Sequence, residues 1–243
     1  MRAGRIQRAE ARVIAEEEFR RFAALTASFA RDDWAKPTDC TGWSVRDVVL
    51  HVLGSGDAQA SVPEFLRQFV RGVPINRQID SHHWVDGINE LQIRERRHLD
   101  DAEIVAQLTA IGPKAVAGRW AAPAPIRHLP IPFGPPVGWV GLWYLFDVGF
   151  TRDVWAHRID LCRATGQEME LTPDHDGRLV ADLVGEWATI HGEPFELVLG
   201  GPAGGTFAQG AGGARVEIDA VEFVRVLSGR ASGAGVLAHP LPL

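Results

Sequence analysis

The sequence predicts an α+β protein, with a helical N-terminal part and a small C-terminal α/β part. The first two-thirds of the chain hold several segments in which apolar residues recur at helical spacing. After Gly166 the composition changes, and short β-prone runs are separated by glycine pairs. We therefore expect one domain over residues 1–170 and another over 171–243. The boundary moves to about residue 193 if the intervening helix belongs to the first part.

The helical part is predicted from apolar spacing and helix caps. Ser44 and Asp47 have the spacing of a capping box, and Asp100 or Asp101 can cap a later helix. Prolines crowd residues 121–138, which predicts a long irregular crossover there. The expected helices are 5–30, 45–57, 84–97, 100–119 and 139–165, with a short helix and a loop at 61–80.

The C-terminal part reads as a small α/β unit. One helix is expected over residues 173–191 and another over 219–227. Glycine pairs separate the runs between these helices, which favours short strands joined by tight turns. The expected strands are 195–199, 206–209, 215–218 and a last one at 236–238.

Composition excludes several classes of protein. The 243-residue chain has a net charge of −6, which argues against a nucleic-acid partner because phosphate binding needs a concentrated basic surface. No run approaches the ~20 apolar residues of a membrane span, and no apolar signal-peptide core follows Met1. Cys40 and Cys162 do not form a secreted disulfide framework. We expect a cytoplasmic protein with a small-molecule substrate.

Asp153 and His157 form half of a possible metal site. They are four residues apart in a segment predicted to be helical, so their side chains stack on one face, one turn apart. A carboxylate oxygen and an imidazole nitrogen placed in this way can bind one cation. The same spacing also arises by accident, so the pair alone is weak support for a metal.

His51 is the candidate third ligand. It lies among valines and leucines on the helix after Ser44, where a hydrogen-bonded core histidine is the simpler interpretation. Asp47 is a rival ligand, but capping accounts for it and we exclude it. Two histidines and one carboxylate leave one coordination position open, as catalytic zinc sites do. Zinc is preferred, although iron, nickel and manganese accept the same ligands.

Other polar residues are weaker candidates. Asp160 can orient His157 as an outer partner or form an ion pair with Arg158 or Arg163. Cys40 lies in a loop with no histidine demonstrably beside it. His82 and His83 can line the entrance to the candidate metal site. The remaining histidines lack a second ligand at a useful spacing: His98, His128, His175, His191 and His239.

Two runs resemble the mycothiol-dependent maleylpyruvate isomerase family, which belongs with the DinB-like four-helix metalloproteins. The first is Pro-Thr-Asp-Cys-Thr-Gly-Trp-Ser-Val-Arg-Asp-Val-Val-Leu-His, ending at His51. The second, from Asp153 to Leu161, is similar to the family's Glu-x-x-x-His-x-x-Asp-Leu. The resemblance implies a DinB-like bundle over 1–170 and a divalent metal on His51, Asp153 and His157, with Asp153 where the family usually has Glu.

The resemblance also implies a thiol cosubstrate. Val-Leu-Ser-Gly-Arg, ending at Arg230, is similar to a family stretch whose arginine belongs to the active site. Arg230 is thus a candidate for catalysis and for binding mycothiol or a substrate carboxylate; a surface arginine is the alternative. We expect a monomer or homodimer that performs thiol S-transfer or cis–trans isomerisation. A hydrolase or lyase of the same fold without thiol chemistry, and a non-catalytic binding protein, remain alternatives.

Overall fold

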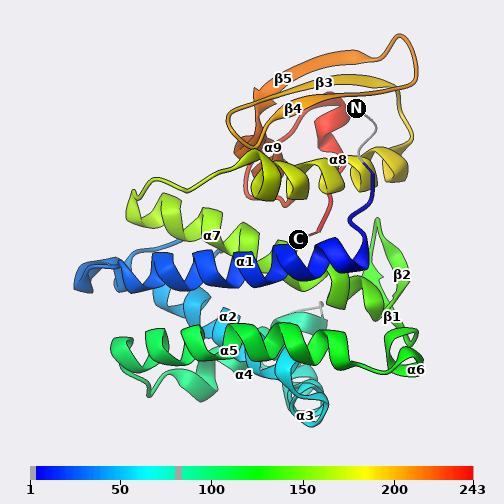
Figure 1. The fold of residues 1–243 in the computed structure, drawn as a ribbon. Coiled ribbons are helices and arrows are strands. Elements are labelled where there is room, and N and C mark those ends of the chain that lie inside the picture. The colour runs from blue at the N-terminus through cyan, green and yellow to red at the C-terminus, as the bar shows by residue number, and fades with distance from the viewer. Residues whose placement is uncertain (1–3, 80–83, 243) are drawn as a thin grey trace. The chain divides into compact units, whose positions relative to one another are not determined.

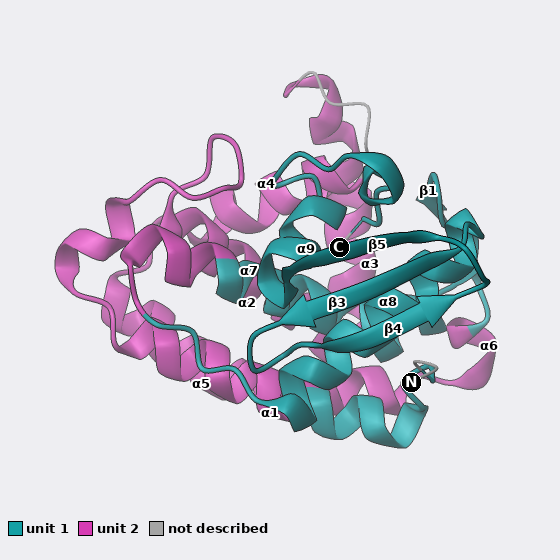
Figure 2. Cartoon of the chain, turned by 90° about the horizontal axis from the view of Figure 1, so that it is seen from above, with its two compact units in different colours: residues 1–14, 128–159, 168–243 teal, residues 15–127, 160–167 magenta. Residues whose placement is uncertain are grey.

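The computed structural model describes residues 4–79 and 84–242 (Figure 1). The chain divides into two compact units that are interleaved along the sequence (Figure 2). The units meet at four points along the chain, and two of these fall within helices, namely α1 (Arg8–Ala27) and α7 (Phe150–Thr165). The domain boundary predicted near residue 170 stays a prediction. Unit 1 contains residues 1–14, 128–159 and 168–243, and unit 2 contains residues 15–127 and 160–167.

Unit 2 is helical and is centred on α2. This helix packs against α3, α4 and α5, and its valines and leucines are almost fully buried. A helix that is apolar on every side lies in a core, and α2 has this character. The predicted helices of this unit are confirmed. Its elements after α1 are η1 (Arg31–Ala35), α2 (Val45–Ala60), α3 (Val62–Gly72), η2 (Val73–Arg77), α4 (Trp84–Arg96), α5 (Asp101–Ala121) and α6 (Ala124–Arg127).

Unit 1 contains a three-stranded sheet of order β4-β3-β5, with β3–β4 antiparallel and β3–β5 parallel. Its strands are β3 (Phe195–Gly200), β4 (Gly205–Gln209) and β5 (Ala214–Asp219), as predicted. Helices α8 (Arg178–His191) and α9 (Ala220–Leu227) cover one face of the sheet (Figures 1 and 2). Trp187 of α8 contacts Phe195 of β3 and Phe223 of α9, with ring centroids 5.0 and 5.4 Å apart. Alternate residues of β3 are buried, which is the pattern of a sheet covered on one face.

Two segments differ from the prediction. The proline-rich segment contains an antiparallel hairpin of β1 (Pro130–Gly134) and β2 (Gly138–Gly141) in place of an irregular crossover. Both are edge strands, where proline is tolerated because one side of the strand needs no donor. The helix expected from residue 139 therefore begins later, with the π-turn η3 (Leu145–Gly149) leading into α7.

The last predicted strand is also wrong. Residues 235–238 form a 3₁₀ turn, η5 (Gly235–Ala238), that packs against α9. Gly235 has φ +59°, a left-handed conformation that turns the chain out of an extended path. Among the described helices, none is long and apolar enough to cross a membrane.

Candidate metal centre

Helix α2 begins at a reciprocal cap. Ser44 Oγ accepts a hydrogen bond from the Asp47 N–H at 3.2 Å, and an Asp47 carboxylate oxygen accepts one from the Ser44 N–H at 3.0 Å. This arrangement satisfies two donors that the first turn would otherwise leave exposed. The predicted capping box is confirmed, and it employs the Asp47 carboxylate at the start of the helix.

His51 is buried on α2 and is held by a glutamine of α4. Its Nδ1 lies 2.8 Å from Oε1 of Gln92, and its side chain is 4% exposed. The amide nitrogen of Gln92 donates to Gln68 Oε1 at 2.8 Å, which fixes which end of the Gln92 amide faces the ring. An amide oxygen only accepts, so Nδ1 of His51 carries the proton. The lone pair of the neutral ring is then on Nε2.

A glycine sets the distance between the two helices that make this contact. A Cβ placed on Gly54 would lie 2.6 Å from Cβ of Gln92 and 2.8 Å from an Arg96 guanidinium nitrogen. No other residue type fits without displacing α4. Gln68 also donates to the backbone oxygen of Gly54 at 2.9 Å. The hydrogen-bonded pair Gln68–Gln92 is therefore attached to α2, the helix that bears His51. The ring is thus fixed in unit 2 by both packing and hydrogen bonds.

Asp153 and His157 lie together on α7, as their spacing predicts. Asp153 Oδ1 is 3.4 Å from His157 Nε2; the histidine side chain is 7% exposed and the aspartate side chain 26%. A carboxylate at this distance either pairs with a protonated ring or shares a cation with a neutral one. The structure therefore brings two of the three predicted ligands together in unit 1. His51 belongs to unit 2, and its joining this pair stays a prediction.

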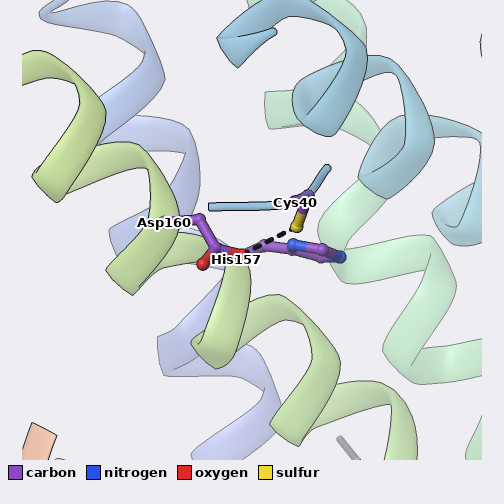
Figure 3. Close-up of side chains that lie close together, drawn as sticks. All are labelled: Cys40, His157 and Asp160. Carbon is purple, nitrogen blue, oxygen red and sulfur yellow. Dashed lines mark hydrogen bonds between the residues drawn. The ribbon is translucent and has the colours of Figure 1, made fainter. Parts of the chain in front are cut away.

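Asp160 has a partner that we did not predict. Figure 3 shows the thiol of Cys40 donating to Oδ2 of Asp160, with Sγ and Oδ2 3.2 Å apart. Asp160 is fully buried one turn after His157 on α7. Of the two arginines considered as partners of Asp160, Arg163 contacts Asp39 and Arg158 contacts Asp176, and an ion pair of either with Asp160 stays a prediction. The loop cysteine is thereby tied to the helix that bears the Asp153–His157 pair.

A buried ion pair anchors α7 within unit 1. Arg158 Nη2 lies 2.5 Å from Asp176 Oδ1, and the Trp155 indole donates to the same oxygen at 2.9 Å. Burial acts to raise the pKa of Asp176, but the Arg158 charge and the hydrogen bonds from Trp155 and the Thr172 N–H outweigh it and hold this pKa below its ordinary value. Both charged side chains are almost fully buried, so neither tolerates loss of the other.

A cavity of about 400 Å³ lies beside another part of α7 in unit 1. Arg152 is a charged residue of its lining and contacts Asp182 and Glu186, which also line the cavity, at 2.6 Å each. Its apolar lining includes Val140 of β2, Val148 of η3 and Ile190 of α8. Arg152 and Asp153 are adjacent in sequence, so their side chains leave a helix about 100° apart. The cavity therefore opens on a side of α7 that differs from that of the Asp153–His157 pair.

Arg230 lies half-buried in the turn after α9. Its N–H donates to the Arg225 carbonyl at 2.8 Å, and the preceding Gly229 has φ +77°. This geometry ends α9 with a left-handed glycine. The roles predicted for the Arg230 side chain stay predictions. Of the other histidines considered, His82 and His83 lie outside the described residues.

The comparisons with known proteins identify the family. A family model for the mycothiol maleylpyruvate isomerase N-terminal domain matches residues 15–162, more than half of the chain. The chain belongs to this family. A crystal structure of the mycothiol-dependent maleylpyruvate isomerase matches with a TM-score of 0.57 and 15% identity, covering 94% of this chain and 91% of that one.

The crystal structure of a histidine-to-alanine mutant of a mycothiol-dependent maleylpyruvate isomerase gives the same TM-score at 14% identity. It covers 93% of this chain and 90% of the other. At these identities the likeness establishes a shared fold. A comparison with curated proteins gave no match. The resemblance predicted from the two motifs and the α+β class are thereby confirmed.

Sequence reasoning missed the two glutamines that orient the His51 ring. Gln68 and Gln92 are almost fully buried, yet each lies in an ordinary helical stretch with no motif around it. The available signal was a glutamine in the apolar stripe of a helix. Such a side chain is rarely buried without a hydrogen-bond partner, so its position indicates a buried polar contact. Cys40 was recognised as a loop residue and as part of the first motif, but its contact with Asp160 was not predicted.

Proposed function

We propose that this member of the family is a divalent-metal-dependent enzyme that activates a small thiol, mycothiol or a close analogue, toward a small electrophilic substrate. His51, Asp153 and His157 are the proposed ligands, with zinc preferred over nickel, iron or manganese. The observation that carries the proposal is the Asp153–His157 pair on α7 of a chain from this family. We further propose that the enzyme acts in the cytoplasm as a monomer or homodimer.

The chemistry of the donor set fits such an ion. Two neutral imidazoles and one carboxylate are the ligands that catalytic zinc commonly has, with a position left for substrate. Gln92 supports the role of His51 because it holds the proton on Nδ1 and leaves Nε2 to donate its lone pair. Asp153 is one methylene shorter than the usual glutamate, so its carboxylate has less reach from α7.

When bound, the cation would supply a thiolate at neutral pH, because a coordinated thiol loses its proton. The protein's part is to exclude water and to orient the reactants. His157 and His51 are both nearly buried, which keeps the donor atoms out of bulk solvent. Arg230 is the proposed contact for a carboxylate of the substrate or for the thiol cosubstrate.

Two outcomes follow from addition of the thiolate to an electrophilic carbon. If the thiolate is expelled after rotation about the former double bond, the thiol is regenerated and the net reaction is cis–trans isomerisation. If the new carbon–sulfur bond is retained, the product is a thioether and the reaction is S-transfer. Both outcomes use the same residues and the same bound thiol.

A second candidate function is a metal-dependent hydrolase or lyase that uses no thiol. The shorter carboxylate of Asp153 favours it, because a changed ligand shell suits an altered reaction. Turnover with mycothiol, with other low-molecular-weight thiols and without thiol distinguishes the two. Substrate turnover that is independent of every thiol would favour the second candidate.

Metal analysis tests the ligand set. We expect protein purified without chelator to contain a divalent metal, and His51→Ala, His157→Ala and Asp153→Asn each to lose it. His98→Ala is the matched control, because His98 is an exposed histidine outside the proposed ligands. The proposed centre is wrong if these three variants keep as much metal as the control.

A further inference from the structure

The cavity beside Arg152 has no part in the proposed metal chemistry. Its volume of about 400 Å³ lies in the range of pockets that bind small molecules, about 300–1,000 Å³. Of the described residues that line it, all belong to unit 1 and none is a proposed metal ligand. The lining combines charged side chains with apolar ones, so a single ligand can make both kinds of contact there.

Two of the charged side chains are occupied by protein partners. Arg152 donates to Asp182 Oδ2 and to Glu186 Oε2 at 2.6 Å each. Asp182 also accepts the Ile6 N–H at 2.7 Å. The side chains of Arg152 and Asp182 are only 3% and 2% exposed. Both therefore support the cavity and have little surface left for a ligand.

Glu186 can still accept hydrogen bonds from a ligand. Its Oε1 accepts the Tyr144 hydroxyl at 2.8 Å, and its Oε2 accepts from Arg152. Burial raises the pKa of Tyr144 above its ordinary value, so the phenol stays protonated as a donor. A carboxylate has about four acceptor positions, and the Glu186 side chain is 21% exposed. Glu186 therefore presents negative charge and free lone pairs to the cavity.

Arg5 supplies the opposite charge. Its guanidinium lies over the Trp143 ring, 4.2 Å from the ring centroid, and it has no acceptor among the described residues. A guanidinium has five N–H donors, and contact with a ring leaves most of them available. The Ile6 N–H that donates to Asp182 holds this N-terminal segment at the cavity. Arg5 is thus a cation that can still bind a carboxylate.

The rest of the lining is largely apolar. Val140, Val148 and Ile190 line the cavity together with the Trp143 ring. Apolar surface of this kind is stabilised by covering it with an apolar group of a ligand. A ligand that is charged throughout would leave these side chains without such a contact. The lining therefore favours a molecule with charged groups at one end and an apolar group at the other.

We propose that this cavity binds a small zwitterion with an apolar side group, such as an apolar α-amino acid. The ligand carboxylate binds Arg5, its ammonium group binds Glu186, and its apolar group packs against Val140, Val148 and Ile190. The two arginines and two carboxylates of the lining balance in charge. A ligand with one charge would leave either Arg5 or Glu186 unpaired, whereas a zwitterion pairs with both.

Calorimetry on the full-length protein at pH 7 tests the ligand class with three probes. L-Phenylalanine has both charged groups, 3-phenylpropionate lacks the ammonium group, and 2-phenylethylamine lacks the carboxylate. We expect saturable binding of L-phenylalanine at one site. Each analogue should bind about tenfold more weakly or worse, as expected for the loss of a hydrogen bond to a charged group. The titrations are repeated with chelator, because amino acids also bind metal ions, and binding at the cavity should persist.

Two variants separate the two charged contacts. Arg5→Gln should weaken L-phenylalanine and 3-phenylpropionate by about tenfold and leave 2-phenylethylamine unchanged. Glu186→Gln should weaken L-phenylalanine and 2-phenylethylamine and leave 3-phenylpropionate unchanged. Arg8→Gln and Glu168→Gln are the matched controls, because both residues are exposed and outside the lining. If Glu186→Gln is unstable, the three probes on Arg5→Gln decide, since Arg5 is exposed and its loss leaves the Arg152 contacts in place.

The proposal fails in three distinguishable ways. No saturable binding of L-phenylalanine would remove the site. Binding of either analogue as tight as that of L-phenylalanine would overturn the zwitterion as the ligand class. Binding that is lost with chelator, or that is equal in Arg5→Gln and Arg8→Gln, would place the ligand elsewhere. The metal centre is not required for any of these results, so this proposal and the proposed function stand or fall separately.

Discussion

Nδ1 of His51 and Oε1 of Gln92 lie 2.8 Å apart between two buried side chains of α2 and α4. This contact decides which ring nitrogen can bind a metal. Gln68 in turn orients the Gln92 amide and donates to the Gly54 carbonyl on α2. The orientation of the His51 ring therefore depends on Gln68 and Gln92, which are not themselves proposed ligands.

Replacing Gln92 should weaken metal binding. In Gln92→Leu the His51 ring loses the acceptor that fixes its tautomer and orientation, and outer partners of this kind contribute about 10–100-fold to metal affinity. Competition with a chromogenic chelator measures the change. Gln107→Leu is the control, because Gln107 is exposed on α5. Equal affinities of Gln92→Leu and wild type would show that the contact does not orient the ligand.

The Gly54→Ala variant should be destabilised by steric overlap. The added methyl would lie 2.6 Å from Cβ of Gln92, and overpacking of this kind costs about 1–3 kcal/mol. Gly56→Ala on the same helix is the control, since its methyl meets only Ile111 side-chain carbons at 3.1 Å or more. Urea denaturation compares the two. We expect Gly54→Ala to lose more stability, and a smaller loss than in Gly56→Ala would contradict the close helix approach.

Asp176→Asn should destabilise unit 1 strongly. Removing this carboxylate leaves the buried Arg158 charge uncompensated, which costs about 3–5 kcal/mol. Asp174→Asn, two residues earlier and exposed, should change the free energy of unfolding little. Chemical denaturation monitored by tryptophan fluorescence measures both. Similar stabilities of the two variants would mean that the Arg158–Asp176 pair is not structurally important.

Stability of the metal-free protein should fall as the pH drops toward 5. The pKa of His191 is lowered in the folded state, so the unfolded chain binds the proton more readily. The contribution of His191 is complete above its unfolded pKa of about 6.5 and is lost as the pH falls through the folded value. His239 and Glu193 are the charged groups that face the ring.

The pH effect is measured by thermal unfolding in chelator between about pH 7 and 5, the range around an unperturbed histidine pKa. We expect His191→Gln to show a shallower fall in Tm than wild type. His98→Gln, which changes an exposed histidine, should follow the wild-type curve. A His191→Gln profile as steep as that of wild type would assign the pH dependence to other groups.

The sequence by itself determined the local features. The cap at Ser44 and Asp47, the helix that carries His51, and the stacking of Asp153 with His157 all follow from interactions within a few residues. The sheet strands were predicted for the same reason, because alternation and glycine turns are local signals. The two motifs also indicated the family that the comparisons confirmed.

Only the tertiary structure decided which distant residues meet. The Gln92–His51 contact joins residues 41 positions apart, and the Cys40–Asp160 contact joins residues 120 positions apart. The hairpin that replaced a predicted loop forms because two short proline- and glycine-containing segments pair with each other. His191 and His239 become neighbours because η5 packs against α9 and returns the chain to the end of α8. Such pairings are set by the packing of whole elements, and no spacing along the chain encodes them.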